Sequence, residues 1–189
     1  MFRVSLAVLA AATLSRAAET RGESAEPAPP ETTVLIADLR TPLAKGFVRG
    51  SWEGRVGTTK SGLVVHGSRG ADGTGELGQD FETPRDLSKA KFIELALGVL
   101  ARNEVPEVTI AFDDASDTQF TARVRIGQVV PEQPVWFRVR LADFKLNNWQ
   151  GNKTSAGIDW TRIARWHLQG DWSKGVPLQV IFIALRARP

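Results

Sequence analysis

The chain has 189 residues, of which 24 are basic and 21 acidic, and it contains neither cysteine nor tyrosine. The lack of cysteine excludes disulfides and any thiolate metal or redox site. The formal charge of +3 is too small to indicate a nucleic-acid partner, because basic residues count there only where they cluster.

Residues 1–17 have the layout of a secretory signal peptide. Arg3 precedes an apolar run over residues 4–14, and small side chains favour cleavage after Ala17. The run is well below the roughly 20 residues that span a bilayer. Removal of Arg3 and Arg16 leaves 22 basic against 21 acidic residues, a net charge of +1. We therefore expect a secreted or periplasmic protein with no transmembrane segment after cleavage.

Residues 18–31 are rich in proline, glutamate, alanine and serine and contain no large apolar side chain. Such a segment cannot bury enough surface to offset its ordering entropy, so we expect a disordered linker. Residues 32–189 are sufficient for one domain, since a chain of about 150 residues buries roughly 70% of its unfolded surface.

Strand-like runs recur through residues 32–189, separated by glycine, proline, aspartate and asparagine, and no window shows a long helical stripe. Short strands with such punctuation predict an all-β fold, either a sandwich or a barrel. The predicted strands cover residues 33–39, 62–66, 91–99, 107–112, 120–126, 135–141, 165–168 and 178–185. The glycine-rich segment 67–78 lacks a following helix and the Gly-Lys-Ser/Thr end of a phosphate-binding loop. We interpret it as a flexible loop between strands.

Asp86 and Asp159 each precede a predicted strand. An aspartate in this position can accept hydrogen bonds from the next backbone amides and start a helical turn before the chain enters the sheet. We interpret both as structural corners, with ligand binding as the less favoured alternative.

Between residues 107 and 144, apolar side chains alternate strictly with polar ones. Alternation of period two is typical of half-buried antiparallel strands, so the intervening residues are expected to share the face opposite the core. That face is basic and aromatic, and it contains Thr121, Arg123, Arg125, Trp136, Arg138 and Arg140. Guanidinium groups bind carboxylate or sulfate in a bidentate manner, and an indole face stacks on a sugar ring. We therefore predict that the arginines and Trp136 bind a glycan, and an acidic glycan is one form that this ligand could take.

An alternative stays open for the same residues. Glu94 and Glu107 are placed to pair with these arginines across strands, which would make a solvated outer surface with no ligand. Trp149 and Trp172 lie in polar segments and are further candidates for ligand contact, whereas Trp160 and Trp166 are interpreted as packing residues.

Residues of the kind that enzymes use are sparse. For His66 and His167 we favour a partly buried, hydrogen-bonded imidazole over a general base. The carboxylates in residues 113–117 are interpreted as a turn, with calcium binding as a minor alternative, because a solvated turn cannot keep a general acid protonated. No catalytic residue is predicted.

Five segments carry a resemblance to a known fold family: DLSKAKFIELAL, VTIAFDD, VWFRVRLADF, GIDWTRIARWHLQG and PLQVIFIALRAR. In this order they resemble the galactose-binding-domain-like jelly roll, above all its carbohydrate-binding modules and the complex I intermediate-associated protein family. The resemblance covers about residues 34–186. It implies a β-sandwich of two antiparallel sheets that presents a face or edge loops to a glycan, often with a structural calcium ion.

The chain departs from these relatives at a position that bears on calcium. Residues 182–185 read Phe-Ile-Ala-Leu where relatives commonly have an aspartate in the last strand. Asp38 remains a candidate ligand, but calcium requires about six to eight oxygens. We therefore predict no cofactor, and a structural calcium ion stays an open alternative that the sequence does not decide.

Together these observations predict an exported, non-catalytic carbohydrate-binding domain whose partner is a polysaccharide or another glycan. One alternative is a module that binds a second envelope protein, as the intermediate-associated relatives imply. A polysaccharide hydrolase or lyase is less favoured, because the absence of tyrosine removes one common acid-base residue.

Overall fold

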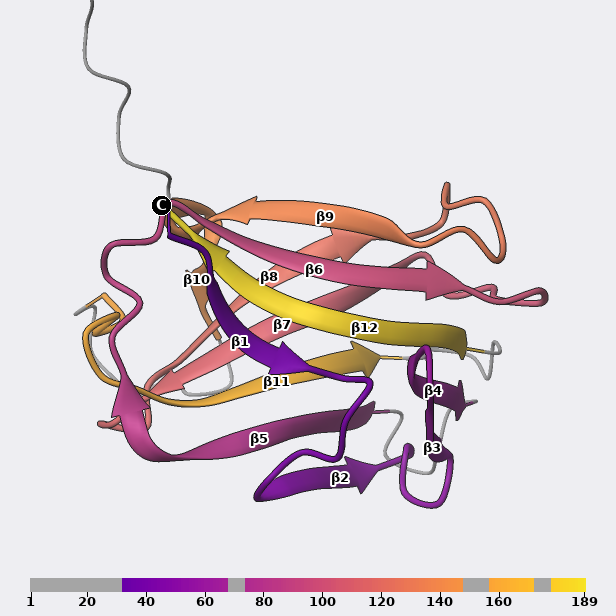
Figure 1. Cartoon of the computed structure of the whole chain (residues 1–189), viewed down its shortest axis with the longest axis horizontal. Coiled ribbons are helices and arrows are strands. Elements are labelled where there is room, and N and C mark those ends of the chain that lie inside the picture. Colours follow the sequence, from indigo (N-terminus) through magenta and orange to yellow (C-terminus); the bar gives the residue numbers. More distant parts are fainter. Residues whose placement is uncertain (1–31, 68–73, 148–156, 172–177) are drawn as a thin grey trace, which may run out of the picture. The chain divides into compact units, whose positions relative to one another are not determined.

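A computed structural model of the chain (Figure 1) describes residues 32–67, 74–147, 157–171 and 178–189. These residues form two antiparallel β-sheets. Sheet A has the strand order β3-β4-β12-β6-β9, with β1 also paired to β12. Its strands are β1 (Val34–Asp38), β3 (Val56–Thr59), β4 (Gly62–Gly67), β6 (Phe92–Val99), β9 (Val135–Arg140) and β12 (Leu178–Arg188).

Sheet B has the strand order β10-β8-β7-β11-β5-β2. Its strands are β2 (Gly46–Gly50), β5 (Thr74–Arg85), β7 (Glu107–Asp114), β8 (Gln119–Arg125), β10 (Lys145–Leu146) and β11 (Ile163–Asp171), and one short 3₁₀ turn, η1, covers Leu141–Asp143. Within the described ranges no helix is long and apolar enough to cross a membrane.

The hydrophobic core is built from the alternating apolar side chains of both sheets. Phe112 on β7 and Trp166 on β11 are fully buried, as is Phe182 on β12. Trp52, from the turn after β2, stacks on Phe182 with ring centroids 6.1 Å apart. Because these residues alternate with polar ones, each sheet turns its remaining side chains outward, away from the core.

The predicted all-β fold of two antiparallel sheets is confirmed, and a strand occupies each of the eight predicted runs. Strands β2, β3, β5 and β10 were not predicted. The interpretation of residues 67–78 as a flexible loop is wrong from Thr74 onward, since β5 begins there.

The glycines of β5 permit close packing and do not act as flexible hinges. A Cβ atom on Gly75 would lie 2.0 Å from Cδ1 of the buried Trp52. A Cβ atom on Gly78 would lie 2.3 Å from the backbone oxygen of Trp166. Both positions therefore need glycine for steric reasons.

The two predicted aspartate corners are confirmed as turns. The backbone amide of Ser88 donates to Oδ1 of Asp86 at 2.9 Å, and the amide of Thr161 donates to Oδ1 of Asp159 at 3.0 Å. Each carboxylate thus satisfies a backbone donor where the chain enters a strand.

The prediction that all the arginines share a face with Trp136 is wrong. Arg123 and Arg125 lie on β8 in sheet B, whereas Trp136, Arg138 and Arg140 lie on β9 in sheet A. Alternation holds within each strand, but the segment between the strands crosses from one sheet to the other. The start of this segment forms backbone hydrogen bonds with Pro106, just before β7, and its end forms one with Val99 at the end of β6. The two outward faces are consequently opposite faces of the sandwich.

Candidate functional site

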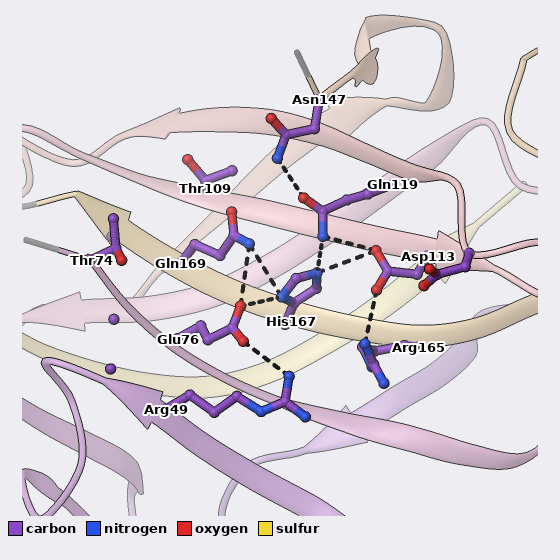
Figure 2. Close-up of a pocket in the computed structure, with 14 residues that line it drawn as sticks. Arg49, Thr74, Glu76, Thr109, Asp113, Gln119, Asn147, Arg165, His167 and Gln169 are labelled. Carbon is purple, nitrogen blue, oxygen red and sulfur yellow. Dashed lines mark hydrogen bonds and ion pairs between the residues drawn. The ribbon is translucent and has the colours of Figure 1, made fainter. Parts of the chain in front are cut away.

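The outer face of sheet B is hollowed into an open cavity of about 710 Å³ (Figure 2). Five neighbouring strands each contribute a polar side chain to its lining: Arg49 from β2, Glu76 from β5, His167 from β11, Asp113 from β7 and Gln119 from β8. We call this cavity the sheet B hollow.

Strand register places the lining residues in rows that run across the sheet. The first row is Arg49, Glu76, Gln169 and Thr109, each paired with the next across neighbouring strands, and Arg123 on β8 extends it beyond the cavity lining. Five strands at about 4.8 Å spacing make this row roughly 19 Å long. A row of polar groups of this length suits an extended ligand that lies across the strands.

The second row explains why the face is hollow. In it, His167 pairs with Gly78 on β5 and with Ala111 on β7. Neither small neighbour has a side chain that fills the space beside the imidazole, and His167 lines the cavity. The ring of Phe47 on β2 meets the imidazole edge-on, with centroids 6.2 Å apart.

His167 lies between two carboxylates. Its Nδ1 is 2.9 Å from Oε2 of Glu76, and its Nε2 is 3.4 Å from Oδ1 of Asp113. The Gln169 amide also donates to Oε2 of Glu76, at 3.3 Å. The imidazole is only 4% exposed, so its orientation is fixed by these neighbours.

Amide side chains extend the network toward β8. Nε2 of Gln119 lies 3.0 Å from Oδ1 of Asp113, to which it donates, and 2.9 Å from Nε2 of His167. Oε1 of Gln119 accepts a hydrogen bond from Nδ2 of Asn147, which follows β10 (Figure 2).

Two guanidinium groups close the network on its other sides. Arg165 binds Asp80 through Nε and lies 3.3 Å from Oδ2 of Asp113 through Nη1. Arg49 reaches Oε1 of Glu76 at 3.4 Å. Each cation of the floor is therefore already balanced by a carboxylate.

This arrangement shifts the ionisation of its members. Burial lowers the pKa of His167, but the hydrogen bonds and charges of Asp113 and Glu76 outweigh it, so the pKa lies above its ordinary value of 6.5. The hydrogen bond from His167 holds the pKa of Glu76 below its usual range. Burial raises the pKa of Asp113, yet His167, Gln119 and Arg165 bring it below the usual range overall. Both carboxyl groups are consequently ionised near neutral pH.

Comparison with known proteins identifies the fold. No family model matches the chain, and no curated protein matches it. An agarase, AgWH50C, matches with a TM-score of 0.59 and 12% identity over 83% of this chain, which spans 25% of the agarase. A family 11 carbohydrate-binding module from Clostridium thermocellum, solved with a β-1,3-1,4-mixed-linked tetrasaccharide, matches with a TM-score of 0.57 and 11% identity. That match covers 82% of this chain and 94% of the module.

A family 30 carbohydrate-binding module also matches, with a TM-score of 0.55 and 13% identity over 83% of this chain and 87% of the module. The domain has the jelly-roll β-sandwich fold of these modules. At these identities the likeness establishes the fold of the jelly roll, and what it binds has to be argued from its own residues.

The predicted ligand-binding residues are distributed over both sheets of the jelly roll. Arg123 extends the first row next to the lining residue Thr109 but does not itself line the hollow, and it is paired with Glu107 at 3.2 Å. Arg125 lies farther along the same strand. Trp149 and Trp172 lie outside the described residues. Ligand binding by these residues stays a prediction.

On β9, Trp136 is 46% exposed, as its position in the alternation predicted. The guanidinium of Arg186 covers its ring at 3.7 Å. Arg138 is paired with Glu94 at 2.8 Å and Arg140 with Asp143 at 2.9 Å. The expectation that Glu94 and Glu107 pair with the arginines is thus confirmed.

The residues of the hollow were not predicted as a site. Glu76 was missed because β5 lacks an apolar alternation. The signal from β11 was present, since Arg165, His167 and Gln169 alternate with buried Trp166 and Leu168. His167 is hydrogen-bonded and buried as predicted, whereas the hydrogen-bonded His66 is exposed.

The carboxylates of residues 113–117 have two uses. Asp113 and Asp114 are buried at the end of β7, which corrects the interpretation of the whole segment as a solvated turn. Asp114 accepts from the backbone amides of Ser116, Thr118 and Asp159, so it fixes the turn and a neighbouring corner. Asp38 is engaged by Arg40, and among the described residues no group of three or more His, Asp or Glu side chains is placed to hold a metal ion.

Proposed function

We propose that this domain binds a carbohydrate chain, without catalysis, in the sheet B hollow. The observation that carries the proposal is a cavity of about 710 Å³ whose lining of carboxylate, amide and guanidinium groups comes from five strands of a jelly-roll sheet. The volume lies in the range of about 300 to 1,000 Å³ typical of ligand pockets. Sugars carry many hydroxyl groups, and such a lining offers them both donors and acceptors. The carbohydrate-binding modules that share the fold support the same function.

Several polar atoms of the hollow are available to a ligand. Within the described residues, Oε1 of Gln169, Oδ1 of Asn147 and the hydroxyl of Thr109 have no protein partner, and all three residues line the cavity. The charged groups beneath them are paired and fixed. The hollow is therefore organised before a ligand arrives, which reduces the entropy lost on binding.

The absence of catalysis is proposed on electrostatic grounds. Hydrolysis of a glycosidic bond needs one carboxylic acid that stays protonated. Glu76 and Asp113, the two carboxyl groups beside His167, both have a pKa below the usual range. Neither is suited to the role of general acid. A protein-binding assembly module is not favoured, since solved structures that share the fold over most of their own length include carbohydrate-binding modules.

The test is a binding panel measured by isothermal titration calorimetry. It includes a mixed-linkage β-1,3-1,4-glucan, agarose oligosaccharides and a polymer of uronic acids. Arg49→Ala and Arg140→Ala form a matched pair, because both remove an exposed arginine that is paired with one carboxylate. We expect Arg49→Ala to weaken binding at least about fivefold, the value of one hydrogen bond, and Arg140→Ala to leave it unchanged.

Two results would contradict the proposal. Failure of every polysaccharide to bind would remove the carbohydrate function. Weaker binding by Arg138→Ala and Arg140→Ala, with no effect of Arg49→Ala, would move the ligand to the arginine and tryptophan residues of β9. Tighter binding of the uronic acid polymer than of the other polysaccharides would support an acidic ligand, as the arginines of the sequence suggested.

Export is proposed from residues 1–17 alone, which lie outside the described residues. Expression in a bacterial host followed by N-terminal sequencing of the exported protein tests it. We expect a mature chain that starts at Ala18. An intact N-terminus on protein retained inside the cell would contradict it.

A further inference from the structure

Three neighbouring strands of sheet A set two arginines around one carboxylate on its outer face (Figure 1). Strand register places Arg138 on β9, Glu94 on β6 and Arg186 on β12 in a single row. Arg138 lies 2.8 Å from Oε1 of Glu94 and Arg186 lies 2.7 Å from Oε2. One carboxylate balances only one of these cations, so the row has a surplus of positive charge. We call these three residues the sheet A arginine cluster.

The cations of the cluster cover the carboxylate. The side chain of Glu94 is 3% exposed, whereas that of Arg138 is 53% exposed and that of Arg186 is 30% exposed. A molecule that approaches this face therefore meets guanidinium groups, with the carboxylate beneath them. The attraction between a guanidinium and an anion is weak in water and grows where the ligand displaces water. The cluster consequently favours an anionic ligand.

The sheet B hollow has the opposite balance of charge. There Arg165 binds two carboxylates, Asp80 and Asp113, and Arg49 meets the carboxylate of Glu76. Two arginines thus face three carboxylates, and even a protonated histidine between them only makes the charges equal. An anionic ligand has no electrostatic reason to enter the hollow, whereas it has one to bind the outer face of sheet A.

Aromatic rings hold the guanidinium groups of the cluster in place. The guanidinium carbon of Arg186 lies 3.7 Å from the centroid of Trp136, and that of Arg138 lies 5.0 Å from the centroid of Phe92. Arg186 binds Glu94 through Nε. To the described residues, neither Nη1 nor Nη2 of Arg186 donates a hydrogen bond. These two nitrogens form a planar fork, the geometry that binds carboxylate or sulfate in a bidentate manner.

We propose that the sheet A arginine cluster and Trp136 form a second binding site, which takes a polysaccharide that carries carboxylate or sulfate groups. The acidic group binds the Nη fork of Arg186. The adjoining sugar ring contacts Trp136, which is 46% exposed although the guanidinium lies over its ring. An acidic sugar fits both features, because it has an anionic group and an apolar ring face. The site does not rest on the proposed function of the hollow, which lies on the opposite face.

Isothermal titration calorimetry with an oligogalacturonate and its methyl ester tests the site. The ester keeps the sugar rings and removes the negative charges. We expect it to bind at least about tenfold more weakly than the acid, the value of a hydrogen bond to a charged group. A sulfated galactan oligosaccharide tests whether sulfate serves in place of carboxylate. Failure of both acidic ligands to bind, or an ester that binds as tightly as the acid, would overturn the proposal.

Variants of the cluster locate the acidic ligand. Arg186→Ala should weaken its binding at least about tenfold, and Arg186→Lys should also weaken it, because lysine keeps the charge but lacks the fork. Arg123→Ala is the matched control, since it removes an exposed arginine paired with a carboxylate from the opposite face. Its affinity should be unchanged. An equal loss in Arg123→Ala and Arg186→Ala, or full affinity in Arg186→Lys, would overturn the site.

Two further measurements keep the test independent of folding. A cooperative urea transition shows that each variant is folded, and in Arg186→Ala the carboxylate of Glu94 still has Arg138. Trp136→Ala breaks no ion pair, and it should weaken binding of the acidic ligand by about two- to tenfold. An unchanged affinity in Trp136→Ala would contradict the contact with a sugar ring. Single-stranded DNA or vesicles of anionic phospholipid that bind as tightly as the oligogalacturonate would contradict a site for polysaccharide.

The outcomes separate this site from the hollow. The uncharged mixed-linkage glucan should bind Arg186→Ala and the wild type equally. Glucan binding without binding of either acidic ligand contradicts the second site alone, and the converse contradicts the function of the hollow alone. Loss of the acidic ligand in Arg49→Ala but not in Arg186→Ala would assign that ligand to the hollow and overturn the second site.

Discussion

Glu94 on β6 forms ion pairs with arginines on the outer face of sheet A. Its carboxylate is 2.8 Å from Arg138 and 2.7 Å from Arg186, and its side chain is only 3% exposed. Burial raises the pKa of Glu94, but the hydrogen bonds from the two arginines bring it below the usual range. We expect Glu94→Gln to lower the free energy of unfolding by about 1 to 2 kcal/mol at pH 7, because the guanidinium groups stay partly solvated. Urea denaturation measures this.

The matched control is Glu107→Gln on β7. Glu107 also meets an arginine, Arg123, at 3.2 Å, but both side chains are exposed. Exposed pairs contribute little, so the change should stay below about 0.5 kcal/mol. Because the pKa of Glu94 is lowered, its contribution is present above the ordinary value of 4.5 and is lost as the pH falls through the folded value. Equal losses of unfolding free energy for the two variants at pH 7 would show that the burial of Glu94 does not affect stability.

Strand β5 crosses the candidate site between β2 and β11, and its glycines are expected to be sensitive to substitution. Gly75→Ala would bring a methyl group into the ring of Trp52, so we expect a loss of about 1 to 3 kcal/mol in a thermal or urea melt. Gly57→Ala on β3 is the control, because a Cβ atom there meets nothing within 4 Å. That variant should be neutral or slightly stabilised. If both variants melt alike, Trp52 does not pack against β5 as described.

The same strand marks the limit of what could be predicted from the sequence. Strands with apolar alternation, such as β7 and β8, were predicted nearly to their ends. Strand β5 contributes Leu77 as its one fully buried large apolar side chain, and its glycines carry no periodicity. Their role depends on Trp52 and Trp166, which are distant in sequence. The local pattern of the sequence therefore predicted the fold but missed Glu76, one of the two carboxylates beside His167.

Which of the two sheets a strand joins depends on the whole molecule. The alternation of apolar and polar residues along the sequence does not determine it. The alternation of side chains along each strand correctly predicted that Trp136 and Arg123 point away from the core. It could not show that the segment between their strands crosses between the sheets, because that depends on backbone bonds to Pro106 and Val99. The two arginine groups are consequently separate surfaces. Only that of β8 adjoins the hollow.

The stability of the domain should be highest in mildly acidic solution. The pKa of His167 is raised, so its contribution is complete below its ordinary value of 6.5 and is lost as the pH rises through the folded value. Glu76, Asp113 and Glu94 have lowered pKa values, so their contributions are lost as the pH falls below about 4.5. Urea denaturation from pH 4 to 9 should therefore give a maximum near pH 5 to 6.5.

His167→Gln should remove the alkaline part of this profile while His66→Gln preserves it. The slope on that side is at most about 1.4 kcal/mol per pH unit, the limit for one proton. A wild-type profile that is flat between pH 6.5 and 9 would mean that the two carboxylates do not hold a proton on His167.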